Sequence, residues 1–213
     1  MSRKNIFHTA ELIIALIVAF QLGIPTIARA ASIGNIDTTP SWNGTTFISS
    51  FGSPNTATYG QTIMAPEGTN SLTSFSFFLL GPTTMVFRGF VADWDSVNKK
   101  VLGTPLYESA PRGVSQSANY EEVVFNIPGG LALKAGQTYV LFASISKDPG
   151  QPNSAGKWGS VGNNTAYPDG QFVFMNNTND TTMWTSTAWS TISQDLAFKA
   201  NFTWHYFMPM ITH

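Results

Sequence analysis

Short runs of alternating apolar and polar residues dominate the chain from about residue 45 onward. In residues 72–80, phenylalanine and leucine alternate with serine, which is the period of a strand with one buried face. Residues 195–204 alternate in the same way, with apolar side chains at the even positions, so Asp195 is expected to face solvent. Residues 138–145 are apolar on both faces, which predicts a strand in the middle of a sheet.

Turn signals containing Gly, Pro and Asn separate these runs, and Pro128-Gly129-Gly130 is expected to end one of them. The polar residues 146–170 predict a long loop. No helical period appears beyond the N-terminal segment. The pattern therefore favours an all-β fold, a two-sheet, jelly-roll-like sandwich. The predicted strands are residues 45–50, 59–64, 72–80, 85–94, 105–108, 120–127, 138–145, 171–175 and 195–204, and residues 131–133 lead into a tight turn at 134–137.

Residues 1–30 have the three parts of a secretory signal peptide. A basic start is followed by an apolar run over residues 12–27 and by the small-residue pattern Ala28-Arg29-Ala30. We predict cleavage after Ala30, a sandwich domain over residues 31–204 and a short tail, 205–213. The mature protein is then expected to be secreted or to lie at the cell surface, with no membrane span.

Net charge and composition disfavour some classes of binding partner and exclude some kinds of site. Without the predicted signal peptide, the chain has 8 basic and 11 acidic residues, a net charge of −3. This balance does not favour binding to nucleic acid or to an anionic membrane surface. The chain contains 0 cysteines, which excludes thiolate zinc sites, iron–sulfur clusters and cysteine nucleophiles.

Four segments occur in an order that is shared with a known family. They are residues 55–62 (NTATYGQT), 87–95 (FRGFVADWD), 130–140 (GLALKAGQTYV) and 195–200 (DLAFKA). Together they resemble an uncharacterised family of exported bacterial β-sandwich domains that are often found in proteins with a PEP-CTERM sorting signal. The sorting signal itself is absent from residues 205–213. The resemblance implies a bacterial, extracellular, jelly-roll-like domain and no particular activity.

Few side chains are available for catalysis. The histidines beyond the predicted signal peptide are His205 and His213, and no Gly-x-Ser-x-Gly motif is present, so a serine hydrolase is not predicted. A glycoside hydrolase needs two carboxylates about 5–10 Å apart in a cleft. Most carboxylates of this chain are in predicted turns, which makes that class the least favoured hypothesis.

Asp93 and Asp95 flank Trp94, and strand alternation directs both carboxylates to the same face. Solvation of a hairpin end and capping of its turn explain this pattern most simply. A calcium site is the alternative, because clustered carboxylate oxygens suit Ca²⁺. No other cofactor is predicted.

Aromatic side chains in polar segments are the candidate ligand-binding residues. Trp158 and Tyr167 lie in the predicted loop, and Trp184 and Trp189 lie in a stretch rich in Asn and Thr. Sugars stack their C–H faces on such rings, while amides and hydroxyls bind the sugar hydroxyls. The competing interpretation is that these rings fold back and cover the open ends of the sandwich.

Three hypotheses on function follow. The first is an exported, non-enzymatic sandwich that binds polysaccharide or belongs to an extracellular matrix or surface layer. The second is a structural or protein-interaction module, which an uncovered sheet edge or an apolar patch would favour. The third is the carboxylate-dependent glycoside hydrolase.

Trp94 and Trp204 end well-patterned strands and are predicted to belong to the core.

Overall fold

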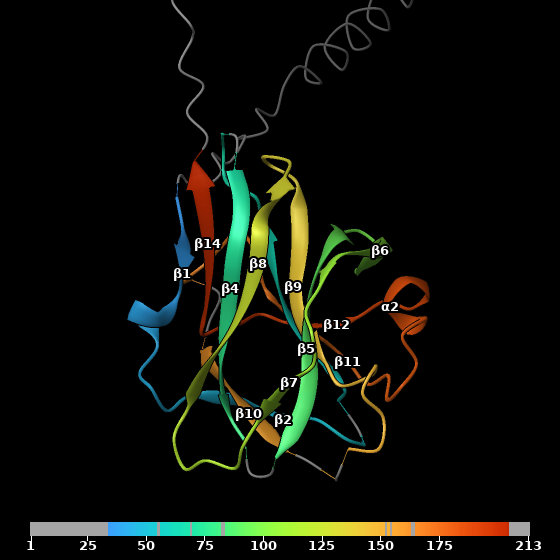
Figure 1. Cartoon of the computed structure of the whole chain (residues 1–213). Coiled ribbons are helices and arrows are strands. Elements are labelled where there is room, and N and C mark those ends of the chain that lie inside the picture. The colour runs from blue at the N-terminus through green and yellow to red at the C-terminus, as the bar shows by residue number, and fades with distance from the viewer. Residues whose placement is uncertain are drawn as a thin grey trace, which may run out of the picture. The chain divides into compact units, whose positions relative to one another are not determined.

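Two antiparallel sheets pack face to face in a β-sandwich, which confirms the predicted fold class (Figure 1). This computed structural model describes residues 34–204, apart from residues 55, 69, 82–83, 152, 154 and 163–164. The predicted signal peptide, the predicted tail and the side chain of Trp204 lie outside the described residues. Within the described part of the chain, no helix has the length and apolar character needed to cross a bilayer.

The first sheet is organised around the long strand β4 (Asn70–Leu80). Strand β14 pairs with one edge of β4 and β8 pairs with the other edge, while β10 pairs with the end of β4. Strand β2 and the short β13 both pair with β10, and β1 pairs with β14. The other strands of this sheet are β1 (Ile36–Asp37), β2 (Phe47–Phe51), β8 (Glu121–Leu133), β10 (Gly156–Val161), β13 (Asp195–Leu196) and β14 (Phe198–Trp204).

The second sheet has the order β12-β11-β3-β9-β5-β6, and β7 pairs with the start of β5. Strand β9 lies between β3 and β5, so the apolar character of both its faces is explained by its central place. The strands of this sheet are β3 (Thr58–Met64), β5 (Met85–Asp95), β6 (Lys100–Glu108), β7 (Arg112–Val114), β9 (Thr138–Ser144), β11 (Phe172–Met175) and β12 (Ser190–Ile192).

The main core fills the space between the sheets and is rich in aromatic rings. The alternation of β4 is confirmed, since Phe75, Phe77 and Leu79 are all buried there. Phe75 also stacks on Phe125 of β8, with ring centroids 4.9 Å apart. Edge-to-face and offset ring pairs of this kind add to the stabilisation that burial itself provides.

A second cluster of buried residues lies on the outer face of the second sheet. Phe90 and Phe142 stack there at 4.8 Å, on the opposite face of β5 and β9 from the main core. The helical turn α2 (Met183–Ser186), which packs against β6, and the chain that follows it cover this cluster (Figure 1). Trp94 is buried in this second cluster, as predicted for a core residue.

The structure corrects several boundaries expected from the sequence, and strand β6, for one, begins at Lys100 and not at Pro105. Strand β10 lies inside the predicted loop of residues 146–170, where pairing with β4 and β2 stabilises a segment that has a weak local pattern. Strand β8 continues through Pro128-Gly129-Gly130 instead of ending there. The register shifts at this point, and both glycines have positive φ, so the chain passes through a bulge.

Asp195 is fully buried, so the expectation that it faces solvent is wrong. Its carboxylate accepts hydrogen bonds from the Gln61 side chain at 3.0 Å and from the backbone N–H of Tyr167 at 2.9 Å. These two donors make burial of a carboxylate tolerable. The predicted inward positions of this segment are confirmed, because Leu196, Phe198, Ala200 and Phe202 are all buried.

Candidate functional site

The four aromatic residues predicted to bind ligand are all buried, so they form no exposed binding surface in this structure. Trp158 lies in the main core, with its ring centroid 4.8 Å from Phe77 and 4.9 Å from Phe51. Tyr167 is part of the same core, and its hydroxyl accepts a hydrogen bond from the Met64 backbone N–H at 3.0 Å.

Trp184 and Trp189 belong to the second cluster instead. The indole N–H of Trp184 donates to Thr58 Oγ1 at 3.3 Å, and that of Trp189 donates to the Trp184 carbonyl at 3.1 Å. The ring centroids of Trp184 and Trp189 lie 5.1 and 5.3 Å from the ring centroid of Phe142. The physical reason for the correction is that burial of these large rings stabilises the fold more than exposure would.

The carboxylates proposed for calcium have other partners. The Asn98 side-chain amide donates to the Asp95 carboxylate at 2.6 Å, and the backbone N–H groups of Asn98 and Val97 donate to it at 2.9 and 3.0 Å. These bonds close the turn after β5 and lower the pKa of Asp95, the Asn98 side chain most of all. Asp93 accepts a hydrogen bond from the Gln137 side chain. Among the described residues, no group of three or more His, Cys, Asp or Glu side chains lies close enough to hold a metal ion.

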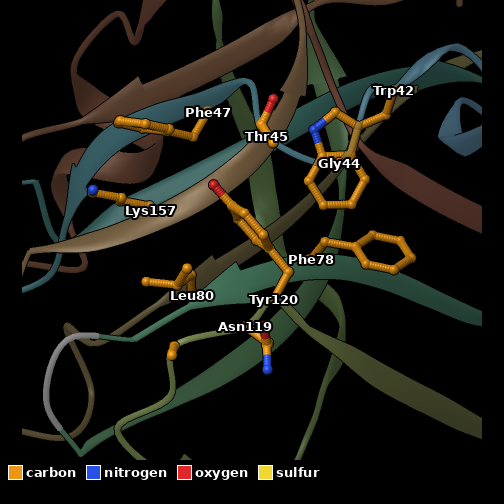
Figure 2. A pocket seen from close by; sticks show the side chains of 10 residues that line it. Trp42, Gly44, Thr45, Phe47, Phe78, Leu80, Asn119, Tyr120 and Lys157 are labelled. Carbon is orange, nitrogen blue, oxygen red and sulfur yellow. The ribbon is translucent and has the colours of Figure 1, made fainter.

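A shallow hollow of about 580 Å³ opens on the outer face of the first sheet (Figure 2). We call it the aromatic groove. Two of its residues come from β4, one from β2 and one from β10, and the others come from the segments just before β2 and β8. It is lined by Trp42, Gly44, Thr45, Phe47, Phe78, Leu80, Ala118, Asn119, Tyr120 and Lys157.

The local chain around Trp42 fixes this ring in place. The side-chain oxygen of Asn43 accepts from the backbone N–H groups of Thr45 and Thr46 at 2.9 and 2.8 Å, which makes a tight turn. The indole N–H of Trp42 donates to the Thr46 carbonyl at 2.8 Å. The indole also packs on the backbone of Gly159, where a Cβ atom would come within 2.6 Å of its ring.

Three further aromatic rings complete the groove. Tyr120 meets Trp42 edge to face, with centroids 4.9 Å apart and planes at 89°, and Phe78 lies 5.2 Å from Trp42. Figure 2 shows the Tyr120 ring between the Trp42 and Phe78 rings and the side chains of Phe47 and Lys157. Phe47 is 44% exposed, which is unusual for phenylalanine in a chain with a large core.

The aromatic groove also has polar groups beside its aromatic rings. Partial burial raises the pKa of Tyr120, so its hydroxyl stays protonated at neutral pH and can both donate and accept hydrogen bonds. Thr45 and Asn119 are exposed at the rim and add a hydroxyl and an amide. None of the ten lining residues carries a carboxylate. Apolar ring surface with a few neutral polar groups is the chemistry that sugars bind.

A second hollow, of about 400 Å³, lies between β6 and α2 and is less suited to a ligand. The Lys147 ammonium on its wall pairs with the Glu108 carboxylate. Trp184, the aromatic residue that lines it, is buried in the second cluster and exposes little of its ring. The aromatic groove is therefore the better candidate site.

Sequence reasoning missed every residue of this groove, although one signal was present. The serines of β4 mark its outer face as polar, yet Phe78 and Leu80 continue the same face with large apolar side chains. Apolar residues at polar positions indicate a surface with a special role. Trp42, Phe47 and Tyr120 carry no comparable pattern, because their proximity depends on the pairing of β2, β10 and β4.

Two solved structures align with this chain at low similarity. Cwp84, a clostridial cysteine protease after propeptide cleavage, aligns at 13% identity and a TM-score of 0.45, covering 76% of this chain and 38% of that chain. The protease and lectin-like domains of Cwp84, a surface layer associated protein of Clostridium difficile, align at 12% identity and a TM-score of 0.44, covering 71% of this chain and 33% of that chain. This chain thus spans well under half the length of either. No protein-family model and no curated protein matches it.

Proposed function

We propose that this chain is an exported, non-enzymatic β-sandwich that binds a glycan in the aromatic groove. Export is the part of the proposal that rests on the signal-peptide pattern of residues 1–30. Binding without catalysis is supported by the lining of the groove, which has aromatic and neutral polar side chains and no carboxylate pair.

One observation carries the proposal. Trp42 and Phe47 come from one segment and Tyr120 from another, more than 70 residues away, and all three line one hollow of about 580 Å³ on the outer face of a sheet. A volume of this size accommodates a few sugar units. The Trp42 indole is held by its hydrogen bond to the Thr46 carbonyl and by contacts with Phe78 and Tyr120, so these rings are already placed before a ligand arrives.

The direct test is a polysaccharide screen with the purified protein, followed by titration of the best ligand against matched variants. Phe47→Ala removes a ring that is 44% exposed in the groove, and Leu106→Ala removes a side chain that is also 44% exposed, on the other sheet. We expect Phe47→Ala to weaken binding about tenfold, roughly 1.4 kcal/mol, and Leu106→Ala to leave it unchanged.

A second pair of variants isolates the tyrosine hydroxyl. Tyr120→Phe removes a hydroxyl that faces the groove, whereas Tyr107→Phe removes one that donates to the Asn126 carbonyl at 2.7 Å, away from the groove. We expect only Tyr120→Phe to change glycan affinity. The proposal fails if the wild-type protein binds no glycan, or if the groove variants bind as tightly as the wild type.

A protein-interaction role is the second candidate, and the edge of the second sheet supports it. Strand β6 ends that sheet, and it exposes Leu102 and Leu106 at 47% and 44%. Exposed leucines on an edge strand favour pairing with another chain. Sedimentation of the wild type and of a Leu102→Lys, Leu106→Lys variant would test for self-association, and monomers in both would count against this role for β6.

A further inference from the structure

The aromatic groove has an unbalanced charge. Of its ten lining residues, Lys157 is the single one with a charged side chain. Lys199 lies nearby, with its ammonium 5.4 Å from the centroid of Phe78, but it pairs with the Glu122 carboxylate at 3.1 Å. The charge of Lys199 is therefore matched by the protein itself.

Lys157 differs from Lys199 in this respect, as far as the described residues are concerned. Within the described part of the chain, no carboxylate forms an ion pair with its ammonium group. The ammonium lies 4.5 Å from the centroid of the Phe47 ring, an attractive cation–π distance that holds the side chain over the groove. Strand β10 anchors its backbone, since Lys157 pairs in register with Leu80 of β4.

Removing water from the Lys157 ammonium costs free energy, and neutral and anionic ligands compensate this cost to different extents. A glycan that stacks on Phe47 also removes water from Lys157, because the two side chains are in contact. Desolvating an ammonium is costly unless an acceptor replaces the water, and a hydrogen bond to an anion is about twice as strong as one to a neutral group. A sugar hydroxyl thus compensates part of this cost, whereas an anionic substituent compensates more of it.

We infer that the aromatic groove selects an anionic glycan, whose charged substituent pairs with Lys157 while a neighbouring sugar ring stacks on Phe47. This inference rests on the proposed glycan binding and adds the class of ligand. The shared chemistry is a negatively charged group on a sugar, either the carboxylate of a uronic acid or a sulfate ester. None of the ten described lining residues carries a carboxylate that would repel such a group.

Matched glycans test the inference on the full-length protein. Each polyuronate oligomer is compared with its carboxyl-reduced form, and each sulfated oligomer with its desulfated form, so that linkage and length stay constant. We expect one anionic series to bind about tenfold more tightly than its neutral counterpart at about 50 mM NaCl, with the preference largely lost at about 500 mM. The series that shows the preference identifies the substituent as a carboxylate or a sulfate.

Lysine variants connect the preference to the proposed residue. Lys157→Gln should abolish the difference between anionic and neutral glycans, and Lys157→Arg should retain it. Lys134→Gln, at an exposed position outside the groove, should behave like the wild type. Circular dichroism of each variant verifies that the fold is intact.

The outcomes separate this inference from the proposed function. If anionic and neutral glycans bind equally, and Phe47→Ala weakens both, the groove binds glycans but the inference is wrong. If the preference survives in Lys157→Gln, the inference is also wrong, because another group recognises the charge. If a glycan of the polysaccharide screen binds but no member of either series does, the inference is wrong and the proposed function stands. If no glycan binds at all, both are wrong.

Discussion

Gln61 of β3 and Asp195 of β13 join the two sheets through a fully buried hydrogen bond. Gln61 Nε2 donates to Asp195 Oδ1 at 3.0 Å, and Gln61 Oε1 accepts from the Leu196 backbone N–H at 2.9 Å. The second carboxylate oxygen accepts from the Tyr167 backbone N–H at 2.9 Å. Each polar group in this network depends on the others, since no water reaches it to replace a missing partner.

Replacing Gln61 with leucine should therefore destabilise the fold. Gln61→Leu leaves the buried carboxylate with one donor fewer and leaves the Leu196 N–H without its acceptor. We expect a loss of about 3 kcal/mol in the free energy of unfolding, measured by urea denaturation. Gln116→Leu, at an exposed position, is the control and should change stability by less than about 0.5 kcal/mol. Equal stabilities of the two variants would contradict the role assigned to Gln61.

The same carboxylate should make stability depend on pH. Burial raises the pKa of Asp195 from its ordinary value of 3.8 to about 6, despite the donors from Tyr167 and Gln61. The folded protein then holds this proton more tightly than the unfolded chain does. The stabilisation is fully present below the unfolded-state pKa and is lost as pH rises through about 6. A shift of about two pKa units corresponds to roughly 3 kcal/mol.

Denaturation of the wild type and of Asp195→Asn across this pH range measures the effect. Asp95 and Asp180 have lowered pKa values, caused mainly by side-chain hydrogen bonds, so their contributions have the opposite sign and are lost as pH falls. The two proteins share these groups, and the difference between their pH profiles therefore isolates Asp195. The expectation is that the wild type loses stability relative to the variant between pH 3.8 and about 6. If the stability of the wild type and of Asp195→Asn changes in parallel with pH, this expectation is wrong.

Gly159 should be required for the shape of the aromatic groove. A Cβ atom at this position would lie 2.6 Å from Trp42 Cζ2, so Gly159→Ala must displace the indole. We expect about 1–3 kcal/mol of destabilisation from overpacking. Glycan affinity should fall about tenfold as Trp42 is displaced from its place in the groove. A Cβ atom added at Gly113 would meet no other atom within 4 Å, so Gly113→Ala serves as the control in the same titration. Wild-type affinity in Gly159→Ala would show that Trp42 does not position the ligand.

Trp184 should matter for stability and not for glycan binding. Its ring covers Phe90 and Phe142, with centroids at 5.0 and 5.1 Å, and Trp184→Ala would leave a large cavity in the second cluster. We expect a loss of about 3–5 kcal/mol in the free energy of unfolding. The neighbouring exposed Thr185→Ala should cost less than about 0.5 kcal/mol. A stable Trp184→Ala protein with impaired glycan binding would reverse this assignment and restore the role first expected for Trp184.

The parts of the fold that were predictable are those with a local two-residue period. Strands β4 and β14 have such a pattern, and their buried faces follow it. Strand β10 has none, because its sequence GKWGSV places glycine and serine around the buried Trp158 and so lacks alternating apolar and polar side chains. Its identity as a strand depends on β2, β4 and β13, all of them more than 30 residues away in the chain, which no local pattern can indicate.

The candidate site was less predictable for a related reason. Reasoning from polar surroundings selected Trp158, Tyr167, Trp184 and Trp189, but polar neighbours in sequence do not determine whether a large ring is buried. The groove combines residues from positions 42 to 157, so its existence depends on tertiary structure.

The second cluster has a consequence for how the chain is made. Phe90 and Phe142 precede Trp184 and Trp189 in the sequence, and synthesis proceeds from the N-terminus. Until residue 189 emerges, the second sheet presents an apolar outer surface that the finished protein conceals. A nascent or truncated chain that ends before α2 would therefore be a preferred client for chaperones and a seed for aggregation.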